Sequence, residues 1–96
     1  MKIKFTPSAK KQFLDAIEFI RLDNPQAAID FRKKSESTLR RLEKFPNSGR
    51  KVPEFPELSY REVIIPPFRF FYRIVGSIIW IIAVWQGAQL PSEPES

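Results

Sequence analysis

Two arginines interrupt the most apolar part of the chain. They are Arg69 and Arg73, in the segment FRFFYRIV, and Tyr60 and Glu62 lie just before them in the segment YREVII. A guanidinium group binds a carboxylate or a phosphate through two parallel hydrogen bonds, and it stabilises negative charge that develops on phosphorus. A carboxyl or phenol group nearby acts as a base or an acid only if its pKa is shifted toward neutrality. These four side chains are therefore candidates for phosphate chemistry or for anion binding.

The composition excludes several other kinds of chemistry. The chain has 96 residues and contains neither cysteine nor histidine, so thiol chemistry, disulfides and histidine bases are excluded. The acidic residues do not cluster and the three glycines are scattered, so we expect no metal, no cofactor and no phosphate-binding glycine loop. The net charge of +5 fits an acidic partner or nucleic acid, and it fits a mildly basic soluble domain equally well.

The first half of the chain predicts one short strand and two helices. Residues 2–5 alternate polar and apolar side chains, as a half-buried strand does. Thr6-Pro7 and Asn24-Pro25 each place a capping side chain before a proline that suits the first position of a helix. The helices are expected over residues 7 to about 22 and 25 to 43 or 44, packed as an antiparallel hairpin. The first has an apolar stripe of Ala9, Phe13, Ala16, Ile17 and Ile20, and the second is expected to bury a stripe of Ala28, Phe31, Ser35, Leu39 and Leu42.

The second half predicts a long loop and three antiparallel strands. Residues 45–59 are rich in proline and polar residues, and the strands are expected over 60–65, 68–75 and 78–85. Gly76-Ser77 suits a two-residue hairpin turn of type II′. The fold class is therefore α+β, in the order β-α-α-β-β-β, as a single domain over residues 1–90 with a disordered acidic tail over 91–96. We find neither a signal peptide nor a membrane span and expect a cytoplasmic protein.

Two-residue turns fix the expected register of the three strands. Arg73 then opposes Trp80, Phe71 opposes Ile82, and Arg69 opposes Val84, so each pair shares a face of the sheet. On the other side of the middle strand, Ile64 opposes Arg69 and Glu62 opposes Phe71. The face expected to pack on the helices carries Val63, Ile65, Phe68, Phe70, Tyr72, Ile74, Ile79, Ile81, Ala83 and Trp85. The other face carries Tyr60, Glu62, Ile64, Arg69, Phe71, Arg73, Trp80, Ile82 and Val84.

The second face is expected to be open, because two helices can cover only one side of the sheet. A large exposed apolar patch of this kind marks a binding surface. The arginines would keep the patch soluble and would bind carboxylates or phosphates of a partner. Alternatively, Arg69 and Arg73 pair with Glu62 across the strands, and the sequence leaves both roles open.

The ordered series of segments resembles the RelE/ParE toxin superfamily. The matching segments are FTPSAKKQFLDAIEFI, DNPQAAIDF, RLEKFPNSGRKVPE, YREVIIPPFRFFYRIV and IIAVWQGAQLP, which together span nearly the whole chain. The NPxAA helix start and the PxxGR loop look more like the ParE side. The resemblance implies a growth-inhibiting toxin of a type II toxin–antitoxin, or plasmid stabilisation, system. RelE-type members cleave mRNA in the ribosomal A site, whereas ParE-type members poison DNA gyrase and are not nucleases.

The resemblance carries over only in part to the residues that RelE-type members use. Arg69 matches their strand arginine, but Tyr60 and Glu62 stand at positions where those members have lysines. In the segment WQGAQ, Gln86 replaces a histidine and Gln89 stands where an arginine is expected. The basic set is largely missing, so we favour a ParE-like toxin that acts by binding and is not an enzyme.

Two alternatives remain, together with an expected binding surface. One alternative is a ribosome-dependent mRNA endonuclease that uses Arg69, Glu62 and Arg73 as catalytic residues, and the other is a weakened toxin. The partners implied are a cognate antitoxin, in a hetero-oligomer with the toxin, and either DNA gyrase or the ribosome with mRNA. Leu14 and Phe19 on the helix hairpin are expected antitoxin contacts. The remaining expected binding residues are Arg50, Arg69, Phe71, Arg73, Trp80, Ile82, Gln86 and Gln89.

Overall fold

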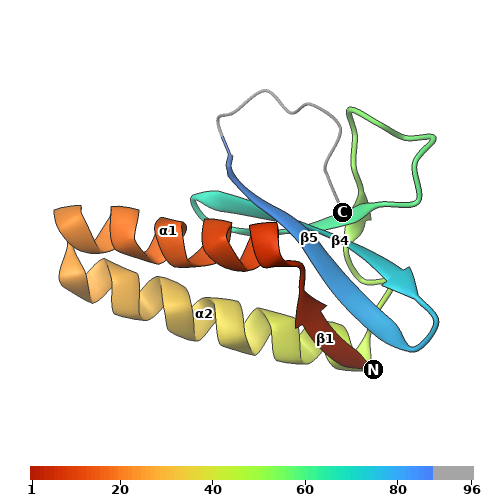
Figure 1. Cartoon of the computed structure of the whole chain (residues 1–96), viewed down its shortest axis with the longest axis horizontal. Coiled ribbons are helices and arrows are strands. Elements are labelled where there is room, and N and C mark those ends of the chain that lie inside the picture. The colour runs from red at the N-terminus through yellow and green to blue at the C-terminus, as the bar shows by residue number, and fades with distance from the viewer. Residues whose placement is uncertain (88–96) are drawn as a thin grey trace.

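The computed structural model describes residues 1–87, in which two long helices lie against a five-stranded sheet (Figure 1). Gln89 and the expected tail over 91–96 lie outside the described residues. The expected order of strand, helix hairpin and antiparallel strands is confirmed. The elements are β1 (Lys2–Phe5), α1 (Pro7–Asp23), α2 (Pro25–Lys44), β2 (Arg50–Lys51), β3 (Arg61–Ile65), β4 (Phe68–Val75) and β5 (Ile78–Gln86).

Both helices begin at the caps that the sequence predicts. The Thr6 hydroxyl oxygen accepts a hydrogen bond from the backbone N–H of Ala9 at 3.2 Å. The Asn24 side-chain oxygen accepts one from the N–H of Ala27 at 3.1 Å. Asn24 also closes α1, because its own N–H donates to the carbonyl oxygen of Ile20 at 2.8 Å. One residue therefore ends α1 and starts α2, which makes the hairpin turn short.

The sheet has the strand order β1-β5-β4-β3-β2. The expected antiparallel strands β3, β4 and β5 form its centre, and two short strands complete its edges. β1 pairs with β5 in parallel, and β2, which lies inside the expected loop, pairs with β3 in antiparallel fashion. Short edge strands leave few unpaired backbone groups open to another chain.

The register between β3 and β4 is the expected one, including Glu62 opposite Phe71 and Ile64 opposite Arg69. At the β4–β5 turn, Gly76 has a φ of 61°, as the first central residue of a type II′ turn does. No non-glycine residue among residues 1–87 has a positive φ.

The register between β4 and β5 is as expected only near this turn. Arg73 opposes Trp80, but an irregularity follows, and Phe71 opposes Ala83 instead of Ile82. Arg69 consequently opposes Trp85 instead of Val84. The physical reason is a β-bulge at Ile82, which leaves one extra residue on β5.

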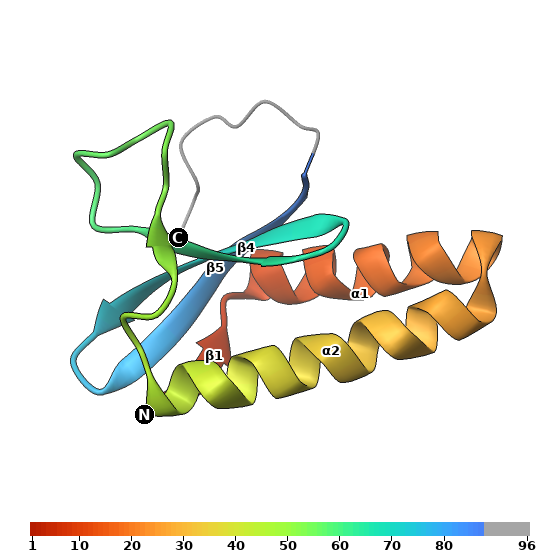
Figure 2. The ribbon, with the colours of Figure 1, turned by 180° about the vertical axis from the view of Figure 1, so that it is seen from behind.

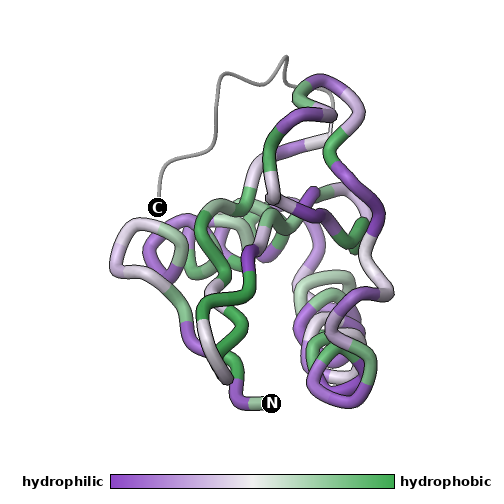
Figure 3. Tube along the Cα trace, turned by 90° about the vertical axis from the view of Figure 1, so that its right-hand side faces the viewer, coloured by the Kyte–Doolittle hydropathy of each residue, from purple (hydrophilic) through white to green (hydrophobic). Residues whose placement is uncertain are grey.

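The bulge reassigns residues to the two faces of the sheet. Val84 joins the core beneath the helices, whereas Ala83 and Trp85 lie on the opposite face together with Ile82. The expected faces are therefore wrong for these residues of β5 beyond the bulge. The rest of the core follows the predicted stripes, with Ala9, Ala16, Phe31 and Leu42 of the helices packed on Phe70, Tyr72, Ile79 and Ile81. Hydrophobic stretches run along the strands, whereas hydrophobic and hydrophilic residues alternate along the helices (Figure 3).

The face turned away from the helices is covered by the chain's own loop. Val52, Phe55 and Tyr60, from the segment between β2 and β3, pack against Phe71, Ile82, Ala83, Trp80 and Trp85. Figure 2 shows this segment projecting on the side away from α1 and α2. The expectation of an open face is thus wrong at its centre, because the loop carries apolar side chains of its own that bury it.

In the part of the chain that the structure describes, no helix combines the length and the apolar character needed to span a membrane.

Candidate functional site

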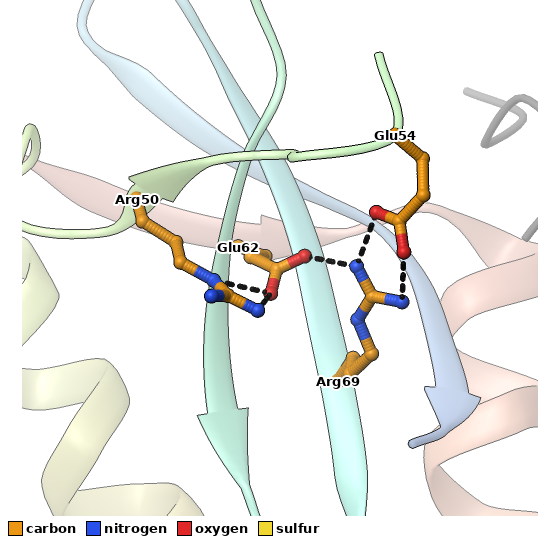
Figure 4. Close-up of polar contacts among 4 residues, drawn as sticks. All are labelled: Arg50, Glu54, Glu62 and Arg69. Carbon is orange, nitrogen blue, oxygen red and sulfur yellow. Dashed lines mark hydrogen bonds and ion pairs between the residues drawn. The ribbon is translucent and has the colours of Figure 1, made fainter. Parts of the chain in front are cut away.

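Four charged side chains form a chain of ion pairs on the loop-covered face (Figure 4). The two terminal nitrogens of Arg69 donate to the two carboxylate oxygens of Glu54, at 3.1 and 2.9 Å. One of them also donates to Glu62. The other carboxylate oxygen of Glu62 accepts a 2.8 Å hydrogen bond from Nε of Arg50. We call this group, Arg50–Glu62–Arg69–Glu54, the ion-pair network.

The strands place three members of the network. Arg50 on β2 lies directly opposite Glu62 on β3, and Glu62 lies opposite Phe71, two residues along β4 from Arg69. Residues two apart on a strand share a face, so Arg69 reaches Glu62 diagonally. The guanidinium carbon of Arg69 lies 5.0 Å from the centre of the Phe71 ring, which adds a cation–π contact.

Glu62 and Arg69, the inner pair of the network, are much more buried than its two outer members. The side chains of Glu62 and Arg69 are 0% and 9% exposed, whereas those of Arg50 and Glu54 are 58% and 38% exposed. A buried carboxylate is stable only when its oxygens are hydrogen-bonded, and here both are. The hydrogen bonds from Arg69 hold the pKa of the Glu54 carboxyl below its usual value of 4.5. The same hydrogen bonds, which the Glu54 carboxylate accepts, raise the pKa of Arg69 against the opposing effect of burial.

The PxxGR segment fastens the loop to the sheet. The hydroxyl of Tyr72, on β4, donates to the carbonyl oxygen of Pro46 at 2.7 Å and accepts from the N–H of Gly49 at 3.0 Å. Arg61 donates to the carbonyl oxygen of Gly49 at 2.9 Å. Arg50, the last residue of the motif, enters the ion-pair network. Proline, glycine and arginine of this motif therefore each have a structural task.

The structure brings some of the expected site residues together and buries others. Arg69 and Glu62 meet, as in the pairing alternative that the sequence left open, but Arg73 makes no ion pair with any residue in 1–87. Phe71 and Ile82 are fully buried, at 0% and 1% exposure. Trp80 is half-buried, and the Lys4 ammonium lies 5.9 Å from the centre of its ring. The exposed Gln86 lies at the end of β5.

A large apolar groove lies elsewhere, at the tip of the helix hairpin. It has a volume of about 790 Å³ and is lined by Phe19, Ile20, Leu22, Phe31, Pro66 and Pro67, with Asp23, Asn24, Ala27, Asp30 and Lys34. Phe19 and Leu22 are 58% and 74% exposed. Phe19 also lines a neighbouring recess with Trp85 and Gln86. We call the larger hollow the Phe19 groove. Among residues 1–87, no three side chains of metal-ligating type lie close enough to hold a metal ion.

Comparison with known proteins decides the family. The model of the ParE toxin of type II toxin–antitoxin systems (parDE) matches residues 3–91. The chain belongs to the ParE toxin family. A similar fold occurs in a chain of the solved chromosomal ParDE TA system from P. aeruginosa, with a TM-score of 0.66 and 22% sequence identity. The match covers 90% of this chain and 95% of the other. No curated protein is similar enough to count as a relative.

Sequence reasoning missed two features of this ParE-family chain. Glu54 completes the network, yet it lies in an irregular loop whose path no periodic pattern announces. Its only signal is an acidic residue between two apolar loop residues, Val52 and Phe55, that could anchor the loop. The Phe19 groove was missed because it forms between distant segments, namely the helix turn and the Pro66-Pro67 turn. Phe19, an antitoxin contact expected from the sequence, is one of the residues that line this groove.

Proposed function

We propose that this ParE-family chain is the toxin of a cytoplasmic type II toxin–antitoxin pair that arrests growth by binding DNA gyrase. A cognate antitoxin binds the toxin and neutralises it. One observation carries the choice of binding over catalysis: the ion-pair network already occupies Arg69 and Glu62. These are two of the three side chains that an mRNA endonuclease would need.

The chemistry of RNA cleavage supports this choice. A general base must come within hydrogen-bonding reach of the 2′-hydroxyl whose proton it removes. The Glu62 side chain is 0% exposed, and each of its oxygens accepts from a guanidinium group, so the carboxylate is not accessible to a substrate. Arg69 likewise directs both terminal nitrogens at carboxylates of its own chain. A toxin that acts by binding needs none of these groups to be free.

The Phe19 groove supports the proposed antitoxin contact. Recognition of an amphipathic helix uses an apolar groove into which side chains spaced by three or four residues insert. The groove offers exposed Phe19 and Leu22 with a floor that includes Phe31, and Asp23, Asp30 and Lys34 supply charged groups. We propose that a helix of the antitoxin occupies this groove, and that Leu14, which is 54% exposed on the same helix, extends the contact.

Two assays of the purified chain test the mode of action. We expect it to inhibit supercoiling of plasmid DNA by gyrase and to leave mRNA intact in a reconstituted translation reaction. Addition of the antitoxin, encoded by a neighbouring gene, should restore supercoiling. Cleavage of mRNA at codon boundaries, with gyrase unaffected, would instead identify the ribosome-dependent endonuclease.

A further inference from the structure

The outer side of α2 carries a row of cations that belong neither to the ion-pair network nor to the Phe19 groove. The exposed members of this row are Lys33, Arg40, Arg41 and Lys44. An α-helix turns by about 100° per residue, so Lys33, Arg40 and Lys44 lie along one stripe of the helix surface. This stripe is opposite the side that buries Leu42, and Arg41 flanks it. We call these four residues the α2 basic stripe.

The α2 basic stripe has no counter-charge within the described part of the chain. None of its four side chains forms an ion pair or a hydrogen bond with another residue in 1–87. Elsewhere on the helices, Lys11 pairs with Asp15 and Arg32 pairs with Glu36. Glu36 and Glu43 are the acidic residues of this half of α2, and both lie on one flank of the helix. The stripe therefore presents positive charge that the chain itself does not neutralise.

The helix dipole accounts for only two of these four charges. Arg41 and Lys44 lie in the last turn of α2, where a cation interacts favourably with the negative end of the helix. Lys33 and Arg40 lie before this turn and gain no such stabilisation. Arg40 and Lys44 are also four residues apart, a spacing at which like charges repel each other. A polyanion bound along the stripe would replace this repulsion by attraction.

A recess continues the stripe at the C-terminal end of α2. It has a volume of about 530 Å³ and is lined by Arg41, Lys44, Phe45, Pro46, Asn47 and Ser48. No carboxylate lines it, and the exposed side chains of Asn47 and Ser48 form no hydrogen bond within residues 1–87. The N-terminal ammonium group donates to the carbonyl oxygen of Glu43 at 3.0 Å and adds a positive charge at this end. Arginine, lysine, asparagine and serine side chains are common partners of DNA phosphates.

We propose that the α2 basic stripe binds the backbone of duplex DNA. At the rise of an α-helix, the distance from Lys33 to Lys44 is about 16 Å, which matches the axial rise of about five base pairs. Duplex DNA carries about one negative charge per 1.7 Å of this length. The only apolar residues between Lys33 and Lys44 are Leu39 and Leu42, and both pack in the core. The stripe thus lacks the apolar centre of a protein–protein interface.

The DNA contact goes beyond the proposed binding to gyrase and antitoxin. No member of the stripe lines the Phe19 groove, which lies at the other end of α2. An antitoxin helix in that groove would leave the stripe accessible. The test below uses neither gyrase nor antitoxin, so its outcome is independent of the proposed function.

Fluorescence anisotropy of a short labelled DNA duplex, titrated with the full chain at several salt concentrations, tests the proposal. We expect saturable binding that weakens with salt, because each phosphate contact releases counterions and contributes about −0.9 to the slope of log affinity against log salt. The double variant Lys33→Gln/Arg40→Gln should weaken binding roughly tenfold at low salt and reduce the slope by about 1.8. Lys33→Gln alone should reduce it by about 0.9. Glutamine has a helix propensity close to that of lysine and arginine, so the fold should persist.

The matched control is Lys10→Gln/Lys51→Gln, which removes the same charge from two exposed positions outside α2. It should change the affinity less than about twofold, because solvent and salt screen distant charges. Equal weakening by the two double variants would assign the binding to net charge alone and overturn the proposal. Absence of saturable binding at low salt, or displacement of the duplex by polyglutamate as effectively as by unlabelled duplex, would overturn it as well.

Discussion

Gly49 lies so close to Tyr72 that a β-carbon at position 49 would come within 2.5 Å of the phenol oxygen. The same oxygen accepts a 3.0 Å hydrogen bond from the Gly49 N–H. The chain therefore needs a residue without a side chain where the loop meets the sheet. This contact holds the PxxGR segment in place and thereby positions Arg50 opposite Glu62.

Gly49→Ala should lower the free energy of unfolding by about 1–3 kcal/mol or more, because the added methyl group overlaps Tyr72 and the carbonyl oxygen of Glu62. Urea unfolding followed by circular dichroism measures this change. Gly87→Ala is the matched control, since a β-carbon added at position 87 would lie 3.1 Å from its nearest neighbour, the carbonyl oxygen of Pro67. Equal costs for the two substitutions would contradict the close approach at Gly49.

Tyr72→Phe should cost about 1–3 kcal/mol, because it leaves the Gly49 N–H and the Pro46 carbonyl without their partner. It should also change the pH dependence of stability. Burial raises the pKa of Tyr72 above its ordinary value of 10.0, so the folded protein holds this proton more tightly than the unfolded chain. That contribution is complete below pH 10 and is lost as the pH rises through the folded pKa. Above pH 10, the free energy of unfolding should therefore fall less steeply with rising pH in Tyr72→Phe than in the wild type. Parallel pH dependences of the two proteins would refute the raised pKa of Tyr72.

Glu62→Gln should destabilise the protein by about 3 kcal/mol, because it leaves the buried Arg69 charge short of a counter-charge. Glu57→Gln, at an exposed position of the loop between β2 and β3, should stay within about 0.5 kcal/mol of the wild type. Thermal or urea unfolding compares the two variants. If Glu62→Gln were as stable as Glu57→Gln, the inner ion pair would have no structural role.

Glu54→Gln should cost about 0.5–1 kcal/mol at neutral pH, since the Glu54 side chain is 38% exposed and solvent screens its ion pair. Arg69 lowers the pKa of Glu54 below 4.5, so the unfolded chain binds this proton more readily than the folded protein. The stabilisation is thus present above pH 4.5 and lost as the pH falls through the folded pKa. The difference between wild type and variant in unfolding free energy should shrink on acidification. A constant or growing difference would count against the two hydrogen bonds between Arg69 and Glu54.

Phe19→Asp should weaken the complex with the antitoxin by at least tenfold, because it places a charge in the apolar groove. Isothermal titration calorimetry with the purified antitoxin measures the affinity. Ile29→Asp is the matched control, because Ile29 is 48% exposed and does not line the groove. Unchanged affinity for Phe19→Asp, or equal losses for both, would show that the antitoxin binds elsewhere.

The sequence predicts the helices and the β3–β4 pairing well because their signals are local. Thr6 and Asn24 cap the helices through bonds to residues three positions ahead, and two-residue turns fix a register directly. The bulge at Ile82 is not local in this sense. It lies in the middle of β5, next to the place where Phe71 and Ala83 pack beneath the loop, and beyond it the assignment of Val84 and Trp85 to faces is inverted.

The candidate site could be predicted only in its parts. Arg69 and Glu62 stood out as charged residues on an apolar sheet, and their pairing was one of two alternatives. Which alternative holds depends on Glu54 and on the cover formed by Val52, Phe55 and Tyr60. These contacts join residues far apart in the sequence, and a loop of prolines and polar residues carries no pattern that reveals them.

Supercoiling by purified DNA gyrase, titrated with the purified full chain, tests the central claim most directly. The claim is that this ParE-family toxin acts by binding, with its ion-pair network reserved for structure. We expect supercoiling to fall as the toxin concentration rises and to recover when the antitoxin is added. Unimpaired supercoiling at toxin concentrations that stop translation and cut mRNA would contradict it.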